Sequence, residues 1–516
     1  MNEYIIGLDY GSASARGVLL DIATGQEVAS HVHNYRHGTL TKSLPDGTLL
    51  PRSWALQVAD DYLEAARDIL GRIGNGKRVR SIGFGFTASS PLPCRADGTP
   101  LHRIAPNAPH AYVKLWKHGA AQPQSERISA MGGAWLDNFN GKVSGEWLMA
   151  KAAQIAEEAP EIWAVTDKFI EGGDWLVWQL TGVEARGLGF AAYKAQFQDG
   201  HGYPDVGIPD MASRLSDPLP VGTPAGDLTD EWLADTGIIG SCTVAVAVID
   251  SHVVLPAVGA VQAGTFVAAL GTSAGVMMLD DQPPRLPKGI EGVAFNGALR
   301  DLWCYEAGQA SFGDTLAWFV DAFPNGSTPA ESFANYEAEA RQVPAGANRL
   351  LALDWWNGNR VPHARSDLSG MILGLNMQTT AVEVYRALIE ALCYGMRLMH
   401  DLFAEGGFAI DKVIMTSGLA SRNALLIQTM ADVLGREIIV PKIANATAVG
   451  AAIHGAFATG MVANYADGAA RFGARGSRRV VPDMAAHATY EQLFESYRTL
   501  VGDRVLQDTM RKLQEL

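Results

Sequence analysis

Two short stretches of this sequence repeat one pattern about half the chain apart. Residues 7–21 read GLDYGSASARGVLLD, and residues 265–279 read TFVAALGTSAGVMML. In each stretch an apolar strand enters a turn of small residues, and a second apolar strand leaves it. Two copies of one supersecondary unit at this spacing predict two similar α/β domains with a cleft between them. Only the first copy carries an acidic residue, Asp9, at the end of its leading strand.

The segments outside the two hairpins alternate between strand and helix patterns. Continuous apolar runs predict buried strands over residues 79–86 and 243–249. A helix is predicted to begin after Thr380, because Thr380 and Glu383 have the spacing of a capping box. A second helix is predicted from an apolar face of five residues, which are Trp54, Val58, Tyr62, Ala66 and Leu70. This alternation favours the α/β class.

The chain length predicts more than one core. A chain of 516 residues exceeds the usual size of a single domain. We expect the first domain to cover residues 1–245 and the second to cover residues 246–516. Helices are expected from about residue 485, where Leu493, Tyr497, Leu500 and Val501 share one face.

Charge and cysteine content limit the classes of function. The net charge of −14 argues against sequence-independent nucleic-acid binding, which needs a basic face. The four cysteines include no C-x-x-C pair, so we expect reduced thiols and a cytoplasmic protein. No signal-peptide pattern opens the sequence. Residues 253–279 contain no charged residue, but Pro256 and several glycines interrupt them, so we expect buried strands and no membrane contact.

The small residues of the two hairpin turns suit phosphate binding. Glycine lets backbone N–H groups approach phosphate oxygens, and hydroxyls add donors, which singles out Gly11, Ser12, Gly271 and Thr272. Asp9 could hold Mg²⁺ directly or through water. The alternative is a pair of ordinary β-hairpins with serine turns. Residues 71–78, GRIGNGKR, resemble a P-loop but follow a helix and end in Arg78, so we interpret them as a helix-to-strand turn.

Longer motifs resemble a known family. They are GGDWLVWQLTG (172–182), AAYKAQF (191–197), YEAGQASFGDTLAWF (305–319), LDWWNGNRVPHA (353–364), YRALIEALCYG (385–395) and GLASRNALLIQTMADVLG (418–435). Together they resemble the FGGY family of carbohydrate kinases, and within it the bacterial ribulokinases. The resemblance covers nearly the whole chain.

The resemblance implies a fold and a reaction. The fold is α/β, with two similar domains of the actin/hexokinase/Hsp70-like (ribonuclease H-like) type and the ATP and sugar sites between them. The reaction transfers the γ-phosphoryl group of ATP, with Mg²⁺, to the terminal hydroxyl of a ketopentose, and ribulose is the favoured sugar. Families of this kind frequently form homodimers, so a homodimer is an expectation by analogy.

The resemblance also implies roles for single residues. Asp250, in AVIDSHVV, matches the catalytic base, and its alternative is a strand-end aspartate that caps a helix. The matches to sugar-binding positions are Trp116, Lys194, Asp250 and Glu306. The matches to nucleotide-binding positions are Gly313, Gly418 and Asn423, beside the hairpin residues Gly11, Ser12, Gly271 and Thr272. Asp9 is the expected ligand of Mg²⁺. Ordinary core, turn or surface roles remain the alternatives.

Several positions depart from the family pattern. Thr87 and His118 stand where aspartates are common in the family, near the expected sugar pocket. Near Asn445, where the family commonly has an acidic residue, this chain has an amide. Ser417 replaces the first of two glycines before the nucleotide helix. The substrate therefore stays open, with xylulose, D-ribulose, erythritol, erythrulose and glycerol as alternatives. A non-enzymatic nucleotide-dependent switch on the same fold and a degenerate sugar-binding member are the remaining hypotheses.

Overall fold

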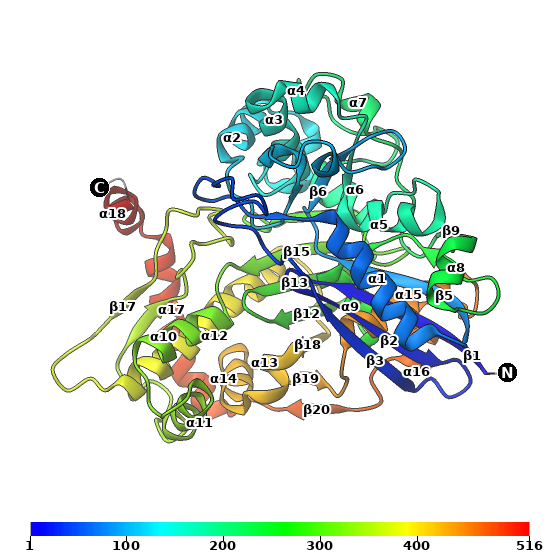
Figure 1. Cartoon of the computed structure of the whole chain (residues 1–516). Coiled ribbons are helices and arrows are strands. Elements are labelled where there is room, and N and C mark those ends of the chain that lie inside the picture. Colours follow the sequence, from blue (N-terminus) through cyan, green and yellow to red (C-terminus); the bar gives the residue numbers. More distant parts are fainter. Residues whose placement is uncertain (1, 515–516) are drawn as a thin grey trace.

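The computed structural model describes residues 2–514 and contains two large mixed β-sheets (Figure 1). The first sheet has the strand order β3-β2-β1-β5-β10-β9, and β11 also pairs with β5. Its strands are β1 (Glu3–Tyr10), β2 (Ser14–Asp21), β3 (Glu27–Asn34), β5 (Arg78–Phe86), β9 (Pro224–Asp227), β10 (Thr243–Ala245) and β11 (Val248–Ile249).

The second sheet has the order β14-β15-β13-β12-β18-β19-β20. Its strands are β12 (Thr265–Leu270), β13 (Ala274–Asp280), β14 (Gly292–Phe295), β15 (Trp303–Gln309), β18 (Lys412–Thr416), β19 (Ile438–Pro441) and β20 (Ser477–Val480). The two repeated stretches of the sequence form the β1–β2 and β12–β13 hairpins, one in each sheet.

The two sheets share one strand pattern around these hairpins. In the first, β1 pairs antiparallel with β2 and parallel with β5, and β2 pairs antiparallel with β3. In the second, β12 pairs antiparallel with β13 and parallel with β18, and β13 pairs antiparallel with β15. The expectation of two similar α/β units is confirmed. The boundary at residue 245 stays a prediction.

Strand alternation decides which side chains of β1 face which helix. Ile6, Leu8 and Tyr10 join an apolar cluster with helix α1 (Ala59–Gly74) and helix α5 (Gly172–Thr181). Ile5 joins a different cluster on the opposite face of the sheet. Because the side-chain period of a strand is two, Gly7 and Asp9 share the face of Ile5.

Two helices lie between the sheets, α9 (Asp250–Ala257) and α15 (Ala446–Ala458). Their apolar side chains form one cluster with residues of both sheets, including Val18 and Val267. Against the first sheet the approach is backbone to backbone. A Cβ added to Gly7 would lie 1.7 Å from the Ala448 oxygen, and one added to Gly83 would lie 1.8 Å from the Ala451 oxygen. Only glycine permits this spacing.

The remaining helices cover the outer faces and build an extension. Helices α2 (Gln122–Met131), α3 (Leu148–Glu158), α4 (Pro160–Ala164) and α7 (Met211–Arg214) gather at the top of Figure 1. They share an apolar cluster of their own. Helix α6 (Leu188–Ala195) leads from this extension towards β14, and α8 (Asp230–Thr236) lies beside α1.

Helices on the outer face of the second sheet enclose the largest apolar cluster. They include α10 (Gly313–Ala322), α11 (Pro329–Ala340), α12 (Ala381–Glu405), α13 (Ser417–Arg422), α14 (Ala424–Leu434) and α17 (Met484–Gly502). Helices α16 (Tyr465–Phe472) and α18 (Arg504–Gln514) complete the set, and β1 and α18 lie at opposite sides of Figure 1. Short paired strands are β4 (Leu56–Gln57) with β7 (Val113–Lys114), β6 (Pro91–Cys94) with β8 (Lys168–Glu171), and β16 (Leu351–Leu353) with β17 (Met371–Leu373).

Several local predictions are confirmed. Helix α12 begins with the full capping box of Thr380 and Glu383. Residues 71–78 join α1 to β5 as a helix-to-strand turn. Residues 265–279 form the buried strands β12 and β13 as predicted, but residues 253–257 belong to helix α9, so the prediction of strands is wrong there. Within residues 2–514 no helix is long and apolar enough to cross a membrane.

Two other local predictions are wrong in detail. The helix predicted from Trp54 begins only at Ala59, because residues 56–57 pair as β4 with β7. The strand predicted over 243–249 is divided into β10 and β11. It breaks at Val246, whose N–H donates to the Thr223 carbonyl outside the ladder at 3.0 Å.

The close contact between α15 and the first sheet predicts that a methyl group added at Gly83 and one added at Gly71 change the stability in opposite directions. Gly83→Ala should destabilise the fold by at least about 3 kcal/mol, because its Cβ would collide with the backbone of α15. Gly71→Ala, in the interior of α1 with open space around it, should stabilise the fold by about 0.5–1 kcal/mol. Thermal unfolding of both variants beside the unaltered chain measures the difference. Equal midpoints for the two variants would contradict the packing described here.

Candidate active site

Each hairpin turn is closed by a hydrogen bond from its first glycine, but the turn of residues 11–14 is one residue longer than the turn of residues 271–273. The Gly11 N–H donates to the Ser14 carbonyl at 3.0 Å, and the Gly271 N–H donates to the Ser273 carbonyl at 2.9 Å. A Cβ at either glycine would first meet that same carbonyl oxygen, at 3.4 Å in both. The duplicated pattern in the sequence therefore corresponds to two glycine turns of different length, each with little side-chain bulk beside its first glycine.

The start of helix α10 rests on the second hairpin turn. The Gly313 N–H donates to the Gly271 carbonyl at 3.0 Å, and the Asp314 N–H donates to the Thr272 carbonyl at 3.2 Å. A Cβ at Gly313 would lie 2.7 Å from the Gly271 oxygen, so a larger residue would force the turn and the helix apart. Three of the predicted nucleotide-binding residues, Gly271, Thr272 and Gly313, are thus in contact.

The segment before the predicted nucleotide helix adjoins this turn. The Leu419 side chain lies 3.8 Å from the position of a Cβ on Gly313, which places Gly418 close to the same turn. Ser417 has a φ of 83°, in the left-handed region that favours glycine. Asn423 is buried and caps α14, because its side-chain oxygen accepts the Leu426 N–H at 2.8 Å.

Asp9 is half-buried on the face of β1 that contacts α15. The Thr447 hydroxyl in the first turn of α15 donates to its carboxylate. Burial raises the pKa of Asp9, and both Thr447 and Arg16 oppose that shift. A cation bound next to Asp9 would stabilise the charged form of its carboxylate.

Asp250 opens helix α9 directly after β11. Its carboxylate accepts the N–H of the neighbouring Ser251 at 2.7 Å. Burial and, to a smaller extent, the negative charge of Asp9 raise the pKa of Asp250 to about 7, although the Ser251 N–H and Lys194 act in the opposite direction. The shift places Asp9, Lys194 and Asp250 within electrostatic reach of one another. A carboxylate with a pKa near neutrality is suited to accepting a proton.

Glu306 contacts the side chains of a lysine and a histidine. Its Oε2 accepts a hydrogen bond from Lys194 Nζ at 2.9 Å, and its Oε1 lies 2.9 Å from Nε2 of the fully buried His252. Burial by itself would raise the pKa of Glu306, but the charge of Lys194 and the contact with His252 lower it to about 2. Glu306 is therefore a fixed anion that joins α6, α9 and β15.

Trp116 connects the extension to the first hairpin. Its indole N–H donates to the Ser12 hydroxyl at 2.8 Å, and its side chain is partly exposed. The structure thus gathers two groups of predicted residues. The first contains Asp9, Ser12, Trp116, Lys194, Asp250 and Glu306, and the second contains Gly271, Thr272, Gly313 and Gly418. Neither group includes a contact with Asn423.

The two departures noted beside the sugar positions are buried. His118 accepts the Ala55 N–H at 3.3 Å on Nδ1, and its Nε2 lies 2.9 Å from the side-chain oxygen of Gln154. Thr87 shares a hydrogen bond of 3.1 Å with the Ser90 hydroxyl. His118 therefore has a structural function in the extension.

Two residues of this site were not identified from the sequence. Thr447 reaches Asp9 from a helix more than four hundred residues away, and no local signal indicates that contact. His252 lies two residues after Asp250, on the opening turn of α9. The closeness of this histidine to a strand-end aspartate is a local signal in the sequence that could have identified it as a site residue.

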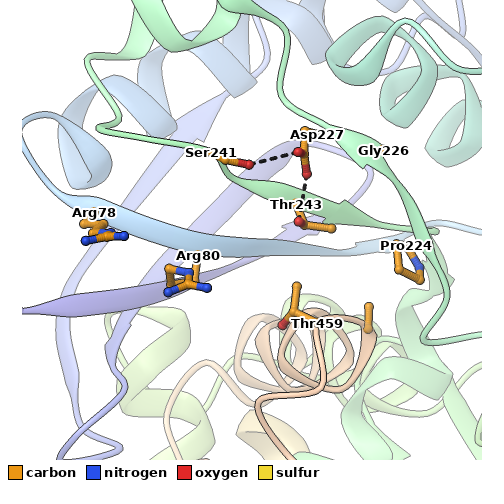
Figure 2. Close-up of a pocket in the computed structure, with 9 residues that line it drawn as sticks. Arg78, Arg80, Pro224, Gly226, Asp227, Ser241, Thr243 and Thr459 are labelled. Carbon is orange, nitrogen blue, oxygen red and sulfur yellow. Dashed lines mark hydrogen bonds between the residues drawn. The ribbon is translucent and has the colours of Figure 1, made fainter.

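A cavity of about 580 Å³ lies elsewhere (Figure 2). Its lining includes Arg78 and Arg80 from the beginning of β5, Asp227, and Thr459 after the last turn of α15. Asp227 accepts hydrogen bonds from Ser241 and Thr243 across the top of this cavity. The residues described above follow the opposite end of β5, so this cavity is not part of the candidate site.

Comparison with known proteins places the chain in a family. Residues 266–459 match the sequence profile of the C-terminal domain of the FGGY family of carbohydrate kinases. The ribulokinase of Mycolicibacterium smegmatis is 38% identical over 96% of this chain and 93% of its own length. The ribulokinase of Geobacillus thermodenitrificans is 37% identical over 99% and 97%.

This chain belongs to the FGGY family of carbohydrate kinases. Its fold also matches that of the xylulose kinase of Rhodospirillum rubrum, with a TM-score of 0.83, 21% identity, and 98% and 99% of the two chains covered. The expected resemblance and the expected fold are confirmed. The protein is an enzyme, a sugar kinase.

The buried Glu306 carboxylate predicts a dependence of stability on Lys194. Lys194→Met should lower the free energy of unfolding by about 3 kcal/mol, because it leaves the carboxylate without its main counter-charge. Lys194→Met/Glu306→Gln should regain part of that loss. Differential scanning calorimetry of the two variants measures both effects, with the exposed Lys117→Met as the control for losing a positive charge.

The same pair predicts a pH effect with a definite sign. In the unaltered chain the folded pKa of Glu306 is lowered from 4.5 to about 2, so its contribution to stability is lost as pH falls through that range. In Lys194→Met burial dominates and the folded pKa rises. Its unfolding midpoint should therefore approach that of the unaltered chain as pH falls from about 8 to about 5. A gap that stays constant over this range would show that Lys194 does not hold the carboxylate charged.

Proposed function

We propose that this kinase transfers the γ-phosphoryl group of ATP to the terminal hydroxyl of a ketopentose, with ribulose as the favoured sugar. The observation that carries the proposal is the similarity to ribulokinases over nearly the whole chain. The assembly of Asp250, Lys194 and Glu306 in one charged group supports it, because these are the residues expected to contact the sugar.

Asp250 is the proposed general base. Phosphoryl transfer needs an acceptor hydroxyl that is oriented and whose proton is accepted as the new bond forms. The position of Asp250 at the end of β11 and its raised pKa fit that role. The proton would pass from the sugar hydroxyl to the Asp250 carboxylate as the hydroxyl oxygen bonds to the γ-phosphorus. The bond from that phosphorus to the oxygen bridging to the β-phosphate would break, and ADP would leave.

Trp116, Lys194 and Glu306 are the proposed sugar-binding residues. An indole face packs against sugar C–H groups, and charged groups form strong hydrogen bonds with hydroxyls. Lys194 and Glu306 already bond to each other, so a sugar hydroxyl would accept from the ammonium and donate to the carboxylate while the pair stays in place.

The two glycine turns are the proposed phosphate-binding elements. Gly11 and Ser12 on one side, and Gly271 and Thr272 on the other, present backbone N–H groups and hydroxyls without large side chains. Gly313 and Gly418 would keep the space beside the nucleotide clear, and Asn423 would lie near the adenosine. Bound MgATP would supply the phosphoryl group that is transferred.

The donor set around Asp9 fits Mg²⁺ that is held partly by ligand phosphates. No group of three or more His, Cys, Asp or Glu side chains within residues 2–514 could hold a metal ion. Nucleotide-bound Mg²⁺ usually takes one or two carboxylates and completes its shell with water and phosphate oxygens. The single half-buried carboxylate of Asp9, with a pKa raised by burial, suits that arrangement.

We also propose a cellular compartment and an oligomeric state for the enzyme. Four buried cysteines without disulfides, Cys94, Cys242, Cys304 and Cys393, support a reducing compartment, and we propose the cytoplasm. A homodimer is proposed by analogy with related families. Xylulose is the alternative sugar, supported by the fold similarity to xylulose kinases at low sequence identity.

A panel of sugars tests the substrate and the base together. Purified protein with MgATP should release ADP on addition of ribulose, and Asp250→Asn should lower that rate by at least about 10³-fold, because no carboxylate remains to orient the hydroxyl and accept its proton. Xylulose, erythritol, erythrulose and glycerol complete the panel. ATP binding by the variant, measured by calorimetry, controls for folding. A fast rate on another sugar would replace ribulose, and an active Asp250→Asn would remove Asp250 from the mechanism.

The raised pKa of Asp250 predicts a pH profile. The base must be ionised, so kcat/KM with both substrates well below their KM should fall as pH falls below about 7, with a slope of one in the logarithmic plot. Above that pH the profile should be flat until other groups titrate. An acid limb centred near the ordinary aspartate value of 3.8 would contradict the proposed burial of the base.

A further inference from the structure

One peptide group in the loop after β5 lies between two buried charges. The carbonyl of Ser89 accepts a hydrogen bond from Lys151 Nζ at 2.5 Å, and the N–H of Ser90 donates to Glu171 Oε2 at 2.8 Å. These two atoms belong to the same peptide unit. Lys151 and Glu171 are 0% and 2% exposed, so both charges act inside the protein. We call this arrangement the peptide clamp.

Lys151 also holds the segment that leads to Trp116. Its ammonium donates to the Leu115 carbonyl at 2.9 Å and to the Lys114 carbonyl at 3.3 Å. An ammonium has three hydrogens, and the three carbonyl acceptors match that number. One buried cation therefore ties the loop of residues 87–90 to the residues directly before Trp116.

Both segments held by the clamp touch the first hairpin. The Thr87 N–H donates to the Tyr10 carbonyl at 3.1 Å, and the Trp116 indole donates to Ser12 at 2.8 Å. Lys151 itself lies on α3, whose preceding residue, Trp147, has its ring centre 5.8 Å from Lys194 Nζ. The clamp is thus continuous with the group that contains the proposed sugar-binding residues.

Lys151 and Glu171 are close enough to each other and to Lys194 for these charges to affect the pKa of both clamp residues. Burial lowers the pKa of Lys151 to about 7, and Glu171 is the main charge that opposes the shift. Burial raises the pKa of Glu171 to about 7, and Lys151 and then Lys194 oppose it. Burying such a pair costs more than burying apolar groups of the same volume. The pair therefore needs an explanation beyond filling space.

The clamp fixes the direction of one peptide group. Ser89 has a φ of 58°, in the left-handed region that costs an L-residue about 1–2 kcal/mol. With the carbonyl at the cation and the N–H at the anion, the observed orientation is favoured. The reversed peptide would place the carbonyl at Glu171 and the N–H at Lys151, so it is disfavoured at both ends.

We propose that Lys151 and Glu171 are positioning residues for the sugar. By holding the Ser89–Ser90 peptide and the residues before Trp116, they fix one wall of the sugar site and so set the KM for the sugar. This inference rests on the proposed function, since it takes Trp116 and Lys194 as sugar-binding residues. Neither positioning residue contacts the reacting atoms.

Kinetics of two variants test the clamp. Lys151→Met should raise the KM for ribulose about 10- to 100-fold, because small displacements of a binding group have effects of this size, and should change the KM for MgATP less than about twofold. Glu171→Gln keeps an acceptor for the Ser90 N–H and loses only the charge, so a smaller rise is expected. Lys117→Met, an exposed neighbour of Trp116, is the control and should leave both constants unchanged.

A rescue experiment separates positioning from general stability. Ser89→Gly removes the cost of the left-handed conformation. Combined with Lys151→Met, it should lower the raised sugar KM at least about threefold, because the loop then reaches its bound shape without the clamp. A KM for sugar that rises together with the KM for MgATP, or no rescue by Ser89→Gly in a folded Lys151→Met protein, would overturn the proposal.

Direct binding distinguishes failure of this inference from failure of the proposed function. Calorimetric titration of ribulose, and of the other sugars in the panel, measures affinity without phosphoryl transfer. If the unaltered chain phosphorylates a different sugar, the same comparison is made with that sugar. Weaker sugar binding in Lys151→Met supports the clamp even if no transfer occurs. If the affinities are equal, the clamp has no positioning function, and if the unaltered chain binds none of the sugars, both proposals fail.

Discussion

The arrangement of this protein around its reaction site depends on the largely buried carboxylate of Glu306, whose side chain is 15% exposed. This carboxylate lies on β15 of the second sheet, and its partners come from α6 and from α9. An isolated buried carboxylate carries a penalty of several kcal/mol, so each of the three elements is stabilised by the presence of the others. The charged group therefore forms only when the second sheet, α6 and α9 have all reached their places.

Much of the fold could be predicted from the sequence, because apolar runs and turns of small residues are local signals. The two hairpins, the capping box of α12 and the turn before β5 all follow from neighbouring residues. The errors arise where a distant partner decides the backbone. Residues 56–57 pair with β7, and Val246 donates to Thr223, although the local patterns favour a helix and an unbroken strand.

The site was only partly predictable for a related reason. Resemblance to a family indicates which residue types matter, but it does not show what supports them. Thr447 meets Asp9 through the packing of α15 on β1, which no local pattern indicates. Lys151 looks like a solvent-facing lysine in an amphipathic helix. The structure buries the helix from Leu148 to Ile155 on every side, and the lysine must then find backbone carbonyls.

Helix α15 meets the two sheets in different ways, and the difference has a mechanical consequence. Against β1 and β5 its backbone touches strand backbone at Gly7 and Gly83, whereas with the second sheet it shares an apolar side-chain cluster that includes Ile453 and Val267. Side chains can change rotamer as surfaces slide, but interlocked backbones cannot. If the halves of this enzyme rotate against each other, the first sheet and α15 turn as one rigid body, and the slip plane lies along the second sheet.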